Sequence, residues 1–391
     1  MKYKVKTLNK ISKGGLSQLA PELFTYGDDV DSPDAILVRS ADMHSYELGK
    51  NLRCIARAGA GTNNIPIAKC SEEGVVVFNT PGANANAVCE LTLCALFLAS
   101  RDIVGGIKWV DSLIGEGDKV PALVEKGKSA FIGPETNGKT LGVVGLGAIG
   151  VMVANAATKL NMDVYGYDPY ISVTAAWKLD RYVKHAQNLD VLYEHSDYIT
   201  LHVPYMDSTK GMINKDSIAK MKDGVSIINF SRGELVNDDD IIAALESGKV
   251  RRYITDFPTE RLIKTKNVIT IPHLGASTPE SEENCAVMAV AELRDYLVNG
   301  NIKNSVNYPD VHMDRSGSGR LCMLHRNIPG EIEQILSLLS AEKVNIENMI
   351  NKSKKEYAYT MIDLNTKVSE AILDKIRGLE GMLRLRVIMD A

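Results

Sequence analysis

The chain has 391 residues, of which 45% are hydrophobic and 24% are charged. This composition is typical of a soluble globular protein and excludes a disordered or fibrous one, while the length predicts two or three domains. The 45 Lys and Arg residues stand against 49 Asp and Glu, which gives a net charge of −4. Such a balance provides no basic surface for nucleic acid or anionic lipid. We therefore expect small-molecule chemistry, with no nucleic acid and no membrane as partner.

The six cysteines form no C-x-x-C pair and lie among apolar residues. They indicate reduced thiols and, because the N-terminal segment lacks the apolar stretch of a secretion signal, a cytoplasmic protein. Residues 140–158 carry no charge, and such a stretch is about as long as a membrane span. Three glycines at fixed spacing inside it make a cofactor loop the better interpretation. No metal site is predicted.

The N-terminal part alternates short β-branched runs with turns and helical patterns, which predicts a parallel α/β lobe. Its predicted strands lie within 2–8, 34–40, 52–59 and 74–80. Residues 85–110 form a mostly apolar run. We expect this run to be one long helix that crosses between two domains.

A second series of strands and helices follows, and its βαβ order predicts a doubly wound parallel sheet. The predicted strands lie within 141–147, 163–168, 198–204, 225–231, 252–257 and 268–273. Another long helix, predicted over 279–299, would return the chain to the first lobe. The expected class is therefore α/β with two doubly wound parallel-sheet domains, namely a discontinuous substrate domain (1–96 and 280–310) and a Rossmann domain (97–279).

Residues 308–319 hold Pro, Gly and Ser with little that is apolar, which predicts a linker. After it, residues 318–391 alternate as strand, helix, strand, strand, helix, strand, with Pro329 at the first position of the earlier helix. This βαββαβ order predicts a small ferredoxin-like domain.

Gly145, Gly147 and Gly150 form a G-x-G-x-x-G motif directly after a predicted strand and at the start of a predicted helix. In a Rossmann domain these glycines allow a tight turn, close approach of backbone to a diphosphate and close packing of helix on strand. Ala148 and Ile149 would then place helix N–H groups at the diphosphate. Asp168, at the end of the next strand, can accept hydrogen bonds from both ribose hydroxyls of adenosine. It would repel a 2′-phosphate, so we predict NAD; the alternative is a glycine-rich turn capped by Asp168.

Arg232, Glu260 and His273 each follow a predicted strand of the same domain. Singly they have ordinary interpretations: a surface ion-pair partner, a solvated loop acid and a satisfied core histidine. Together they suit the oxidation of a secondary alcohol, because a histidine can take the hydroxyl proton while a carboxylate stabilises the imidazolium. The arginine can clamp a substrate carboxylate and polarise the neighbouring carbonyl.

Several segments resemble the D-2-hydroxyacid dehydrogenase family. They are 57–65, 78–91, 136–150, 229–245, 257–260 and 272–278. The resemblance implies that Arg232, Glu260 and His273 are the catalytic set. It further implies cofactor contacts by His202, Pro204 and Asp256 and substrate contacts by the residues Arg57, Asn79, Gly82, Asn84 and Arg39.

Within the family, Arg57 matches a position that holds a substrate phosphate. The resemblance therefore implies NAD-dependent oxidation of 3-phosphoglycerate to 3-phosphohydroxypyruvate, the first step of serine synthesis. Another D-2-hydroxy acid as substrate, or a non-catalytic NAD-binding regulator of the same fold, stays open. Residues 321–388 resemble an ACT domain, which implies that His325, Asn327 and Asn345 bind L-serine as an inhibitor. Serine would tie paired ACT domains together in a homodimer or homotetramer and restrict domain motion.

Overall fold

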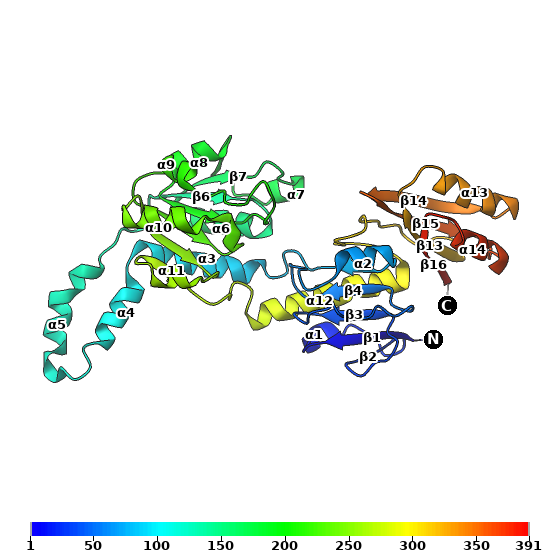
Figure 1. Ribbon diagram of the computed structural model, residues 1–391, viewed down its shortest axis with the longest axis horizontal. Coiled ribbons are helices and arrows are strands. Elements are labelled where there is room, and N and C mark those ends of the chain that lie inside the picture. The colour runs from blue at the N-terminus through cyan, green and yellow to red at the C-terminus, as the bar shows by residue number, and fades with distance from the viewer. Residues whose placement is uncertain (1, 390–391) are drawn as a thin grey trace. The chain divides into compact units, whose positions relative to one another are not determined.

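The computed structural model describes residues 2–389. They form two compact units, one made of the chain up to Asn84 together with the chain from Pro279 onward, and the other of Ala85–Thr278 (Figure 1). None of the helices described is both long enough and apolar enough to span a membrane.

The first unit contains a five-stranded parallel sheet in the order β2-β1-β3-β4-β5. Its strands are β1 (Tyr3–Leu8), β2 (Phe24–Gly27), β3 (Ala35–Val38), β4 (Cys54–Arg57) and β5 (Val76–Phe78). The order is that of a doubly wound fold whose connections reverse direction between β1 and β3. The four predicted strands are confirmed, whereas β2 was missed because its exposed polar positions gave no apolar run.

Three helices accompany this sheet, and the longest supplies much of its core. They are α1 (Lys13–Leu16), α2 (Ile67–Glu72) and α12 (Pro279–Asn299). The prediction of α12 is confirmed. Its buried Ala289, Leu293 and Leu297 belong to the same hydrophobic cluster as Val5, Leu37 and other strand residues. A segment nearly two hundred residues away in sequence therefore completes the lobe.

The second unit contains a seven-stranded parallel sheet in the order β12-β11-β10-β9-β6-β7-β8. The strands are β6 (Thr140–Val144), β7 (Asp163–Tyr167), β8 (Val183–His185), β9 (Tyr198–Leu201), β10 (Val225–Asn229), β11 (Val250–Thr255) and β12 (Val268–Thr270). This is the Rossmann order with one strand added at an edge. All six predicted strands are confirmed, and the short edge strand β8 was missed because its residues are largely exposed.

In the part of the chain that the structure describes, the second unit contains nine α-helices, most of which pack on this sheet and connect its strands. They are α3 (Ala85–Ser100), α4 (Ile103–Asp111), α5 (Val120–Gly127), α6 (Ala148–Lys159), α7 (Val173–Ala176), α8 (Leu189–His195), α9 (Lys215–Ala219), α10 (Asp238–Glu246) and α11 (Glu260–Lys264). The α3 helix buries Ala95, Leu96 and Ala99 against α6 and strand residues.

The prediction of one helix over 85–110 is wrong, because the chain divides into α3 and α4. Asp102 begins α4 as its N-cap, with Oδ1 accepting from Gly105 N at 3.2 Å, and it also pairs with Arg252 at 3.3 Å. Capping carboxylates favour a helix start over a helix interior. Beyond this point α4 and α5 form an arm, and none of its residues from 103 to 131 is buried.

The C-terminal part of the first unit is an antiparallel sheet in the order β14-β15-β13-β16. Its elements are β13 (Gly319–Arg326), α13 (Glu331–Ala341), β14 (Ile346–Lys354), β15 (Tyr357–Leu364), α14 (Glu370–Arg377) and β16 (Met382–Met389). The predicted βαββαβ order is confirmed. Both helices pack on one face, where Ile335 and Ile376 meet strand residues such as Leu321 and Ile362.

The opposite face of this sheet packs on the N-terminal lobe. Leu324 and Tyr359 lie in one hydrophobic cluster with Phe78 and Tyr296. Tyr359 is fully buried there and donates to the carbonyl of Gly300 at 2.6 Å. The C-terminal sheet and the N-terminal lobe therefore share a core.

The prediction of a linker at 308–319 is wrong. Tyr308 is fully buried and donates to the carbonyl of Ser71 at 2.6 Å. Val311 is also buried, and it forms a β-bridge with Ile302. The Pro, Gly and Ser content of the segment is compatible with tight turns as well as with flexibility, and here two apolar side chains decide the outcome.

A fully buried ion pair holds the end of this segment to the C-terminal sheet. Arg320 Nε and Nη2 lie 2.6 and 2.8 Å from the two carboxylate oxygens of Asp363. The guanidinium also donates to the carbonyls of Asn299, Met313 and Asp314. Burial alone would raise the pKa of Asp363, but Arg320 outweighs it and the pKa lies below its usual value.

Replacement of Arg320 by Met should lower the free energy of unfolding by about 3–5 kcal/mol, because the buried carboxylate of Asp363 loses its partner. Urea titration of the full chain measures this. The matched control is Lys184→Met, which breaks an exposed pair with Asp163 and should cost at most about 1 kcal/mol. Since the folded pKa of Asp363 is depressed, its stabilisation is present at neutral pH and is lost in acid, below about pH 4. Equal losses in the two variants would contradict this role.

Candidate active site

The glycine motif follows β6 and shows the close approaches that its residues were expected to allow. Gly145 has a φ of 90°, and a Cβ there would lie 2.5 Å from the carbonyl oxygen of His202. A Cβ on Gly150 would lie 1.9 Å from the carbonyl oxygen of Gly145. Neither position can hold a side chain without moving backbone, so both glycines are required by the turn itself.

The N-terminus of α6 is open at the second glycine of the motif. Gly147 is the N-cap of α6, no side chain caps the helix there, and a Cβ on this residue would meet nothing within 4 Å. The helix begins with Ala148 and Ile149, whose free N–H groups and positive dipole end suit an anion. These features fit the diphosphate of a dinucleotide.

Asp168 lies beside this loop at the end of β7. Its Oδ2 accepts from Leu146 N at 2.9 Å, and its Oδ1 accepts from Tyr170 N at 2.8 Å. The carboxylate thus fixes the turn, as in the alternative interpretation, and is held next to the glycines. Each of its oxygens can accept a second hydrogen bond.

His202 and Pro204 follow β9, the strand adjacent to β6. His202 N donates to Val144 O at 2.7 Å, and its Nε2 lies 3.0 Å from Thr200 Oγ1. Burial lowers the pKa of His202 to about 4, so the imidazole is neutral at neutral pH. The carbonyl of Pro204 accepts from Thr209 Oγ1 at 2.7 Å. The loop therefore lies next to the glycine motif, at the point where the strand order reverses.

Arg232, Asp256 and His273 come together at the carboxyl ends of β10, β11 and β12. Asp256 and His273 line a cavity of about 630 Å³ with Phe257, whose ring meets that of His273 edge-on at 4.9 Å between centroids. Asp256 is buried, with Oδ1 unpartnered and Oδ2 accepting from Gly275 N at 3.3 Å. Burial raises the pKa of Asp256, while the nearby His273 and Arg232 oppose the rise.

Glu260 does not join this group. It is exposed at the first position of α11 and pairs with Lys264 one turn later. The structure thus brings His273 and Arg232 together with Asp256, and it leaves Glu260 turned to a lysine of its own helix.

The two arginines predicted to bind substrate lie at the carboxyl ends of adjacent strands. Arg57 ends β4, and its Nε donates to the carbonyl of Arg39 and to Asn64 Oδ1, both at 3.1 Å. Arg39 follows β3 and pairs with Glu282 at 2.6 Å. Asn64 also donates to the carbonyl of Ala41 at 2.8 Å, so it orients Arg57.

The remaining predicted substrate residues follow β5. Asn79 donates through Nδ2 to the carbonyl of Ala60 at 2.5 Å, which joins this loop to the one after β4. Gly82 has a φ of 82°, a conformation that favours glycine. Asn84 is half-buried just before α3.

The predicted effector residues do not lie together within the C-terminal sheet: His325 and Asn327 lie at the end of β13, and Asn345 lies just before β14, at the opposite end of the sheet. His325 is buried, with Nδ1 at 2.8 Å from the carbonyl oxygen of Arg326 and Nε2 at 2.8 Å from Thr360 Oγ1. Burial lowers its pKa. Asn327 and Asn345 are exposed, which leaves them open to a ligand.

Sequence reasoning missed three residues that position the site. Phe257 packs against His273, Asn64 orients Arg57, and Asn9 Oδ1 accepts N–H groups of the loop after β3, including that of Ala41 at 2.8 Å. Asn64 lay inside a recognised segment, and Asn9 follows a predicted strand. These positions were the sequence signal for Asn64 and Asn9, but they did not indicate which groups the two side chains would contact.

Comparison with known proteins agrees with this geometry. Residues 98–275 match the family described as D-isomer specific 2-hydroxyacid dehydrogenase, NAD binding domain. The D-3-phosphoglycerate dehydrogenase of Haemophilus influenzae is 31% identical over 343 residues, which cover 84% of this chain and 79% of that protein. The chain belongs to the D-isomer specific 2-hydroxyacid dehydrogenase family, and its nicotinamide cofactor is NAD.

Other relatives differ in length and in name. The D-3-phosphoglycerate dehydrogenase of Synechocystis is 36% identical over 73% of this chain, which spans about half (51%) of its length. The hydroxypyruvate reductase of Thermotoga maritima is 36% identical over 73% of this chain and 89% of its own. The NAD+-bound 3-phosphoglycerate dehydrogenase of Entamoeba histolytica aligns at a TM-score of 0.62 and 25% identity, over 78% of this chain and 99% of its own.

Replacement of Gly147 by Ala tests the cofactor site. The Cβ meets no atom within 4 Å, so the free energy of unfolding should change by less than about 0.5 kcal/mol. The methyl group would occupy the path of the diphosphate, and NAD affinity should fall about tenfold, as for overpacking worth about 1.4 kcal/mol. Calorimetric titration of NAD measures it, with Gly49→Ala, which also meets nothing, as control. Unchanged affinity would exclude close approach of the diphosphate at this residue.

Proposed function

We propose that the protein oxidises D-3-phosphoglycerate at its 2-hydroxyl to 3-phosphohydroxypyruvate, with NAD as oxidant. The observation that carries this proposal is the arrangement of Arg57 and Arg39 at neighbouring strand ends, with Arg57 oriented by Asn64. A substrate phosphate needs cationic partners, and guanidinium groups match its geometry. The names of the relatives from Haemophilus and Synechocystis support the same substrate.

In the proposed reaction His273 takes the hydroxyl proton of the substrate, and Arg232 holds the substrate carboxylate. Arg232 is exposed and its own Nη1 donates to Ser231 O at 2.6 Å, so most of its donors are available to a ligand. Phe257 fixes one side of the His273 ring. Bound NAD supplies the hydride acceptor.

Glu260 would act by accepting a hydrogen bond from the imidazole of His273. Its present partner, Lys264, is one helical turn away and both side chains are exposed. Such a pair contributes only about 0.3–0.5 kcal/mol. We propose that Glu260 exchanges Lys264 for His273 when substrate binds, because a developing imidazolium is the better partner inside a desolvated site.

Reduction of hydroxypyruvate is the second candidate. The relative from Thermotoga maritima carries that name, and this chain covers 89% of its length. Hydroxypyruvate lacks the phosphate, so the two candidates differ in whether Arg57 contributes to binding.

Assay of NADH formation with 3-phosphoglycerate, D-glycerate and D-lactate tests the proposal. Turnover of 3-phosphoglycerate should exceed that of the other two acids. Arg57→Gln should raise the KM for 3-phosphoglycerate about ten- to a hundredfold, which corresponds to the loss of a charged hydrogen bond, and should leave that for D-glycerate unchanged. Equal effects of the variant on both acids, or preference for unphosphorylated acids, would move the assignment to the second candidate.

The C-terminal sheet is proposed to be an ACT domain that binds L-serine as an inhibitor. Asn327 is exposed in the loop before α13, and Asn345 is exposed after α13, just before β14. An amide can both donate to a carboxylate and accept from an ammonium group. The strand β14 is an edge of its sheet, and edge strands can pair with a second copy. Serine bound across such a pair would restrain the domain motion that catalysis requires.

Addition of millimolar L-serine should suppress turnover. In Asn327→Ala the serine concentration for half-inhibition should rise at least about tenfold, because a hydrogen bond to a charged ligand is lost. The control is Asn348→Ala on β14, whose amide donates to Ser316 and does not face the loop before α13. Insensitivity of the wild-type enzyme to serine would remove the regulatory proposal and leave the dehydrogenase intact.

We also propose that the protein is a homo-oligomer that pairs through the arm of α4 and α5. This arm leaves large apolar side chains exposed, namely Ile107 at 58%, Ile114 at 88% and Ile132 at 76%. Contiguous exposed apolar surface marks an interaction site.

A further inference from the structure

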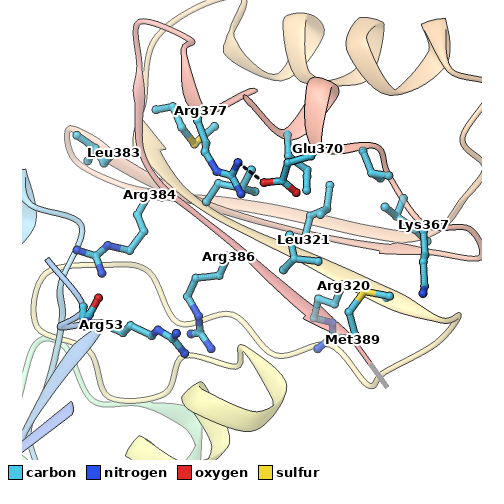
Figure 2. A pocket seen from close by; sticks show the side chains of 18 of the residues that line it. Arg53, Arg320, Leu321, Lys367, Glu370, Arg377, Leu383, Arg384, Arg386 and Met389 are labelled. Carbon is cyan, nitrogen blue, oxygen red and sulfur yellow. Dashed lines mark hydrogen bonds and ion pairs between the residues drawn. The ribbon is translucent and has the colours of Figure 1, made fainter. Parts of the chain in front are cut away.

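Cavities of the first unit differ in how their buried charged groups are partnered. In one of about 820 Å³ beside β16 and α14, the buried cations Arg320 and Arg386 already donate to groups of the fold, and Arg377 pairs with Glu370 (Figure 2). Another, of about 530 Å³, has Glu292 in its wall. This buried carboxyl group has one oxygen without a hydrogen-bond partner among residues 2–389. None of the functions discussed above uses it.

Glu292 belongs to one face of α12. Met288, Glu292, Asp295 and Asn299 follow one another at intervals of three or four residues and line the cavity along this face. Only 6% of Glu292 is exposed. Burial of a polar group costs free energy unless hydrogen bonds replace its contacts with water. The position of this carboxyl group therefore depends on the one hydrogen bond that it has.

That hydrogen bond connects Glu292 to the chain after α12. Glu292 Oε1 accepts from Asn304 Nδ2 at 2.6 Å. Asn304 has a φ of 59°, a left-handed conformation in which asparagine is one of the few side-chain-bearing residues found often. The carbonyl oxygen of Asn304 accepts in turn from Asn79 N at 3.3 Å. Glu292 thus holds the residue that contacts the first residue after β5.

Asn79 joins the loop after β5 to two other segments. Its Nδ2 donates to the carbonyl of Ala60 at 2.5 Å, in the loop that follows β4. Beside it, Phe78 and Ser305 form an isolated antiparallel β-bridge, so the chain after α12 runs along the end of β5. The loop that is predicted to meet the substrate carboxylate therefore starts at a point that Asn304 holds.

We propose that Glu292 is a positioning residue for substrate binding, which acts through Asn304 to hold Asn79 and the loop after β5 in the arrangement that meets the substrate carboxylate. Glu292 itself does not touch the substrate. The inference rests on the proposed function only in that this loop binds the carboxylate of a D-2-hydroxy acid. It does not depend on which acid is bound, because all of them carry that group.

Ionisation of Glu292 should loosen this arrangement. Burial raises the pKa of Glu292 to about 8, although the hydrogen bond from Asn304 and the nearby Lys303 oppose the rise. The carboxyl group is therefore mostly neutral at about pH 7 and mostly ionised at about pH 9. An ionised carboxylate prefers a hydrated position to a buried one, so alkaline pH should release Asn304 and weaken substrate binding. The charged groups around Glu292 come from α12 and the chain that follows it, namely Arg294, Asp295, Lys303 and Asp310.

The variant Glu292→Gln, which is neutral at every pH and keeps an acceptor for Asn304, tests this dependence. The KM is measured for whichever D-2-hydroxy acid is turned over fastest. At about pH 7 the variant and the wild type should have the same KM. At about pH 9 the wild-type KM should be about tenfold higher than that of the variant, because only about one molecule in ten keeps Glu292 neutral one unit above its pKa. The ratio of the two kcat values and the affinity for NAD should not change with pH.

Hydrogen exchange of the segment 78–84 in the full chain, followed by mass spectrometry without substrate, tests the contacts directly. Asn304→Gly removes the amide but permits the left-handed backbone, so exchange should be faster than in the wild type and the KM about two- to tenfold higher. At about pH 9 the segment should exchange more slowly in Glu292→Gln than in the wild type. The control is Asn299→Ala, which removes an amide that donates to Asp295 on the same face of α12 and should behave as the wild type does.

A KM ratio between the wild type and Glu292→Gln that is the same at both pH values would overturn the proposal. Unchanged exchange of 78–84 in Asn304→Gly, or equal effects in Asn299→Ala, would do the same, since the loop would then be held by other contacts. Absence of turnover with every acid would contradict the proposed function. The exchange measurement needs no turnover, so it still decides whether Glu292 and Asn304 hold the loop.

Discussion

The parallel direction of the strands is the constraint on which the rest of the structure depends. Every strand pair in the five-stranded and seven-stranded sheets is parallel. The carboxyl ends of all strands in one sheet therefore lie at one edge, and a crevice opens where the strand order reverses. Residues that are far apart in sequence therefore lie together at this edge, and no direct contact between them is needed to place them there.

This constraint explains how much of the site the sequence could predict. A residue just after a buried strand is placed at the functional edge whatever its neighbours are, so Arg232 and His273 could be located from strand patterns, whereas Arg57 was identified through the family resemblance. Their partners could not. Asn64 orients Arg57 across a turn, and Glu260 pairs with Lys264 on its own helix. Such contacts depend on side-chain geometry, which a pattern of apolar residues does not carry.

The same distinction between strand patterns and individual side-chain contacts applies to the fold. Strands buried on both faces gave clear apolar runs and were predicted, whereas the exposed edge strands β2 and β8 gave none. Two boundaries were also misjudged. Asp102 divides an apolar run into two helices, and Tyr308 secures a segment whose composition favoured a linker. In both cases the structure of the segment depends on one side chain. The average composition of a segment does not show the effect of a single residue.

The C-terminal sheet is organised differently from the two parallel sheets. Its helices cover one face, and its other face is a wall of the core that Phe78 and Tyr296 also form. Charge reinforces this attachment, since Arg384 and Arg386 reach carbonyls of the N-terminal lobe and of α12.

Because the C-terminal sheet and the N-terminal lobe share a core, the segment that can be recognised by its order of elements does not coincide with a folding unit. The βαββαβ segment can be recognised as a module by its order of elements, yet Leu324 and Tyr359 are buried in a cluster that residues of the N-terminal lobe complete. Segments that bury one another's apolar surface open together, as a single cooperative group. Native-state hydrogen exchange in β13 and β15 would then report on the lobe as much as on the sheet itself. We therefore expect the three sheets to open as two cooperative groups, because the inner face of the C-terminal sheet shares its core with the N-terminal lobe.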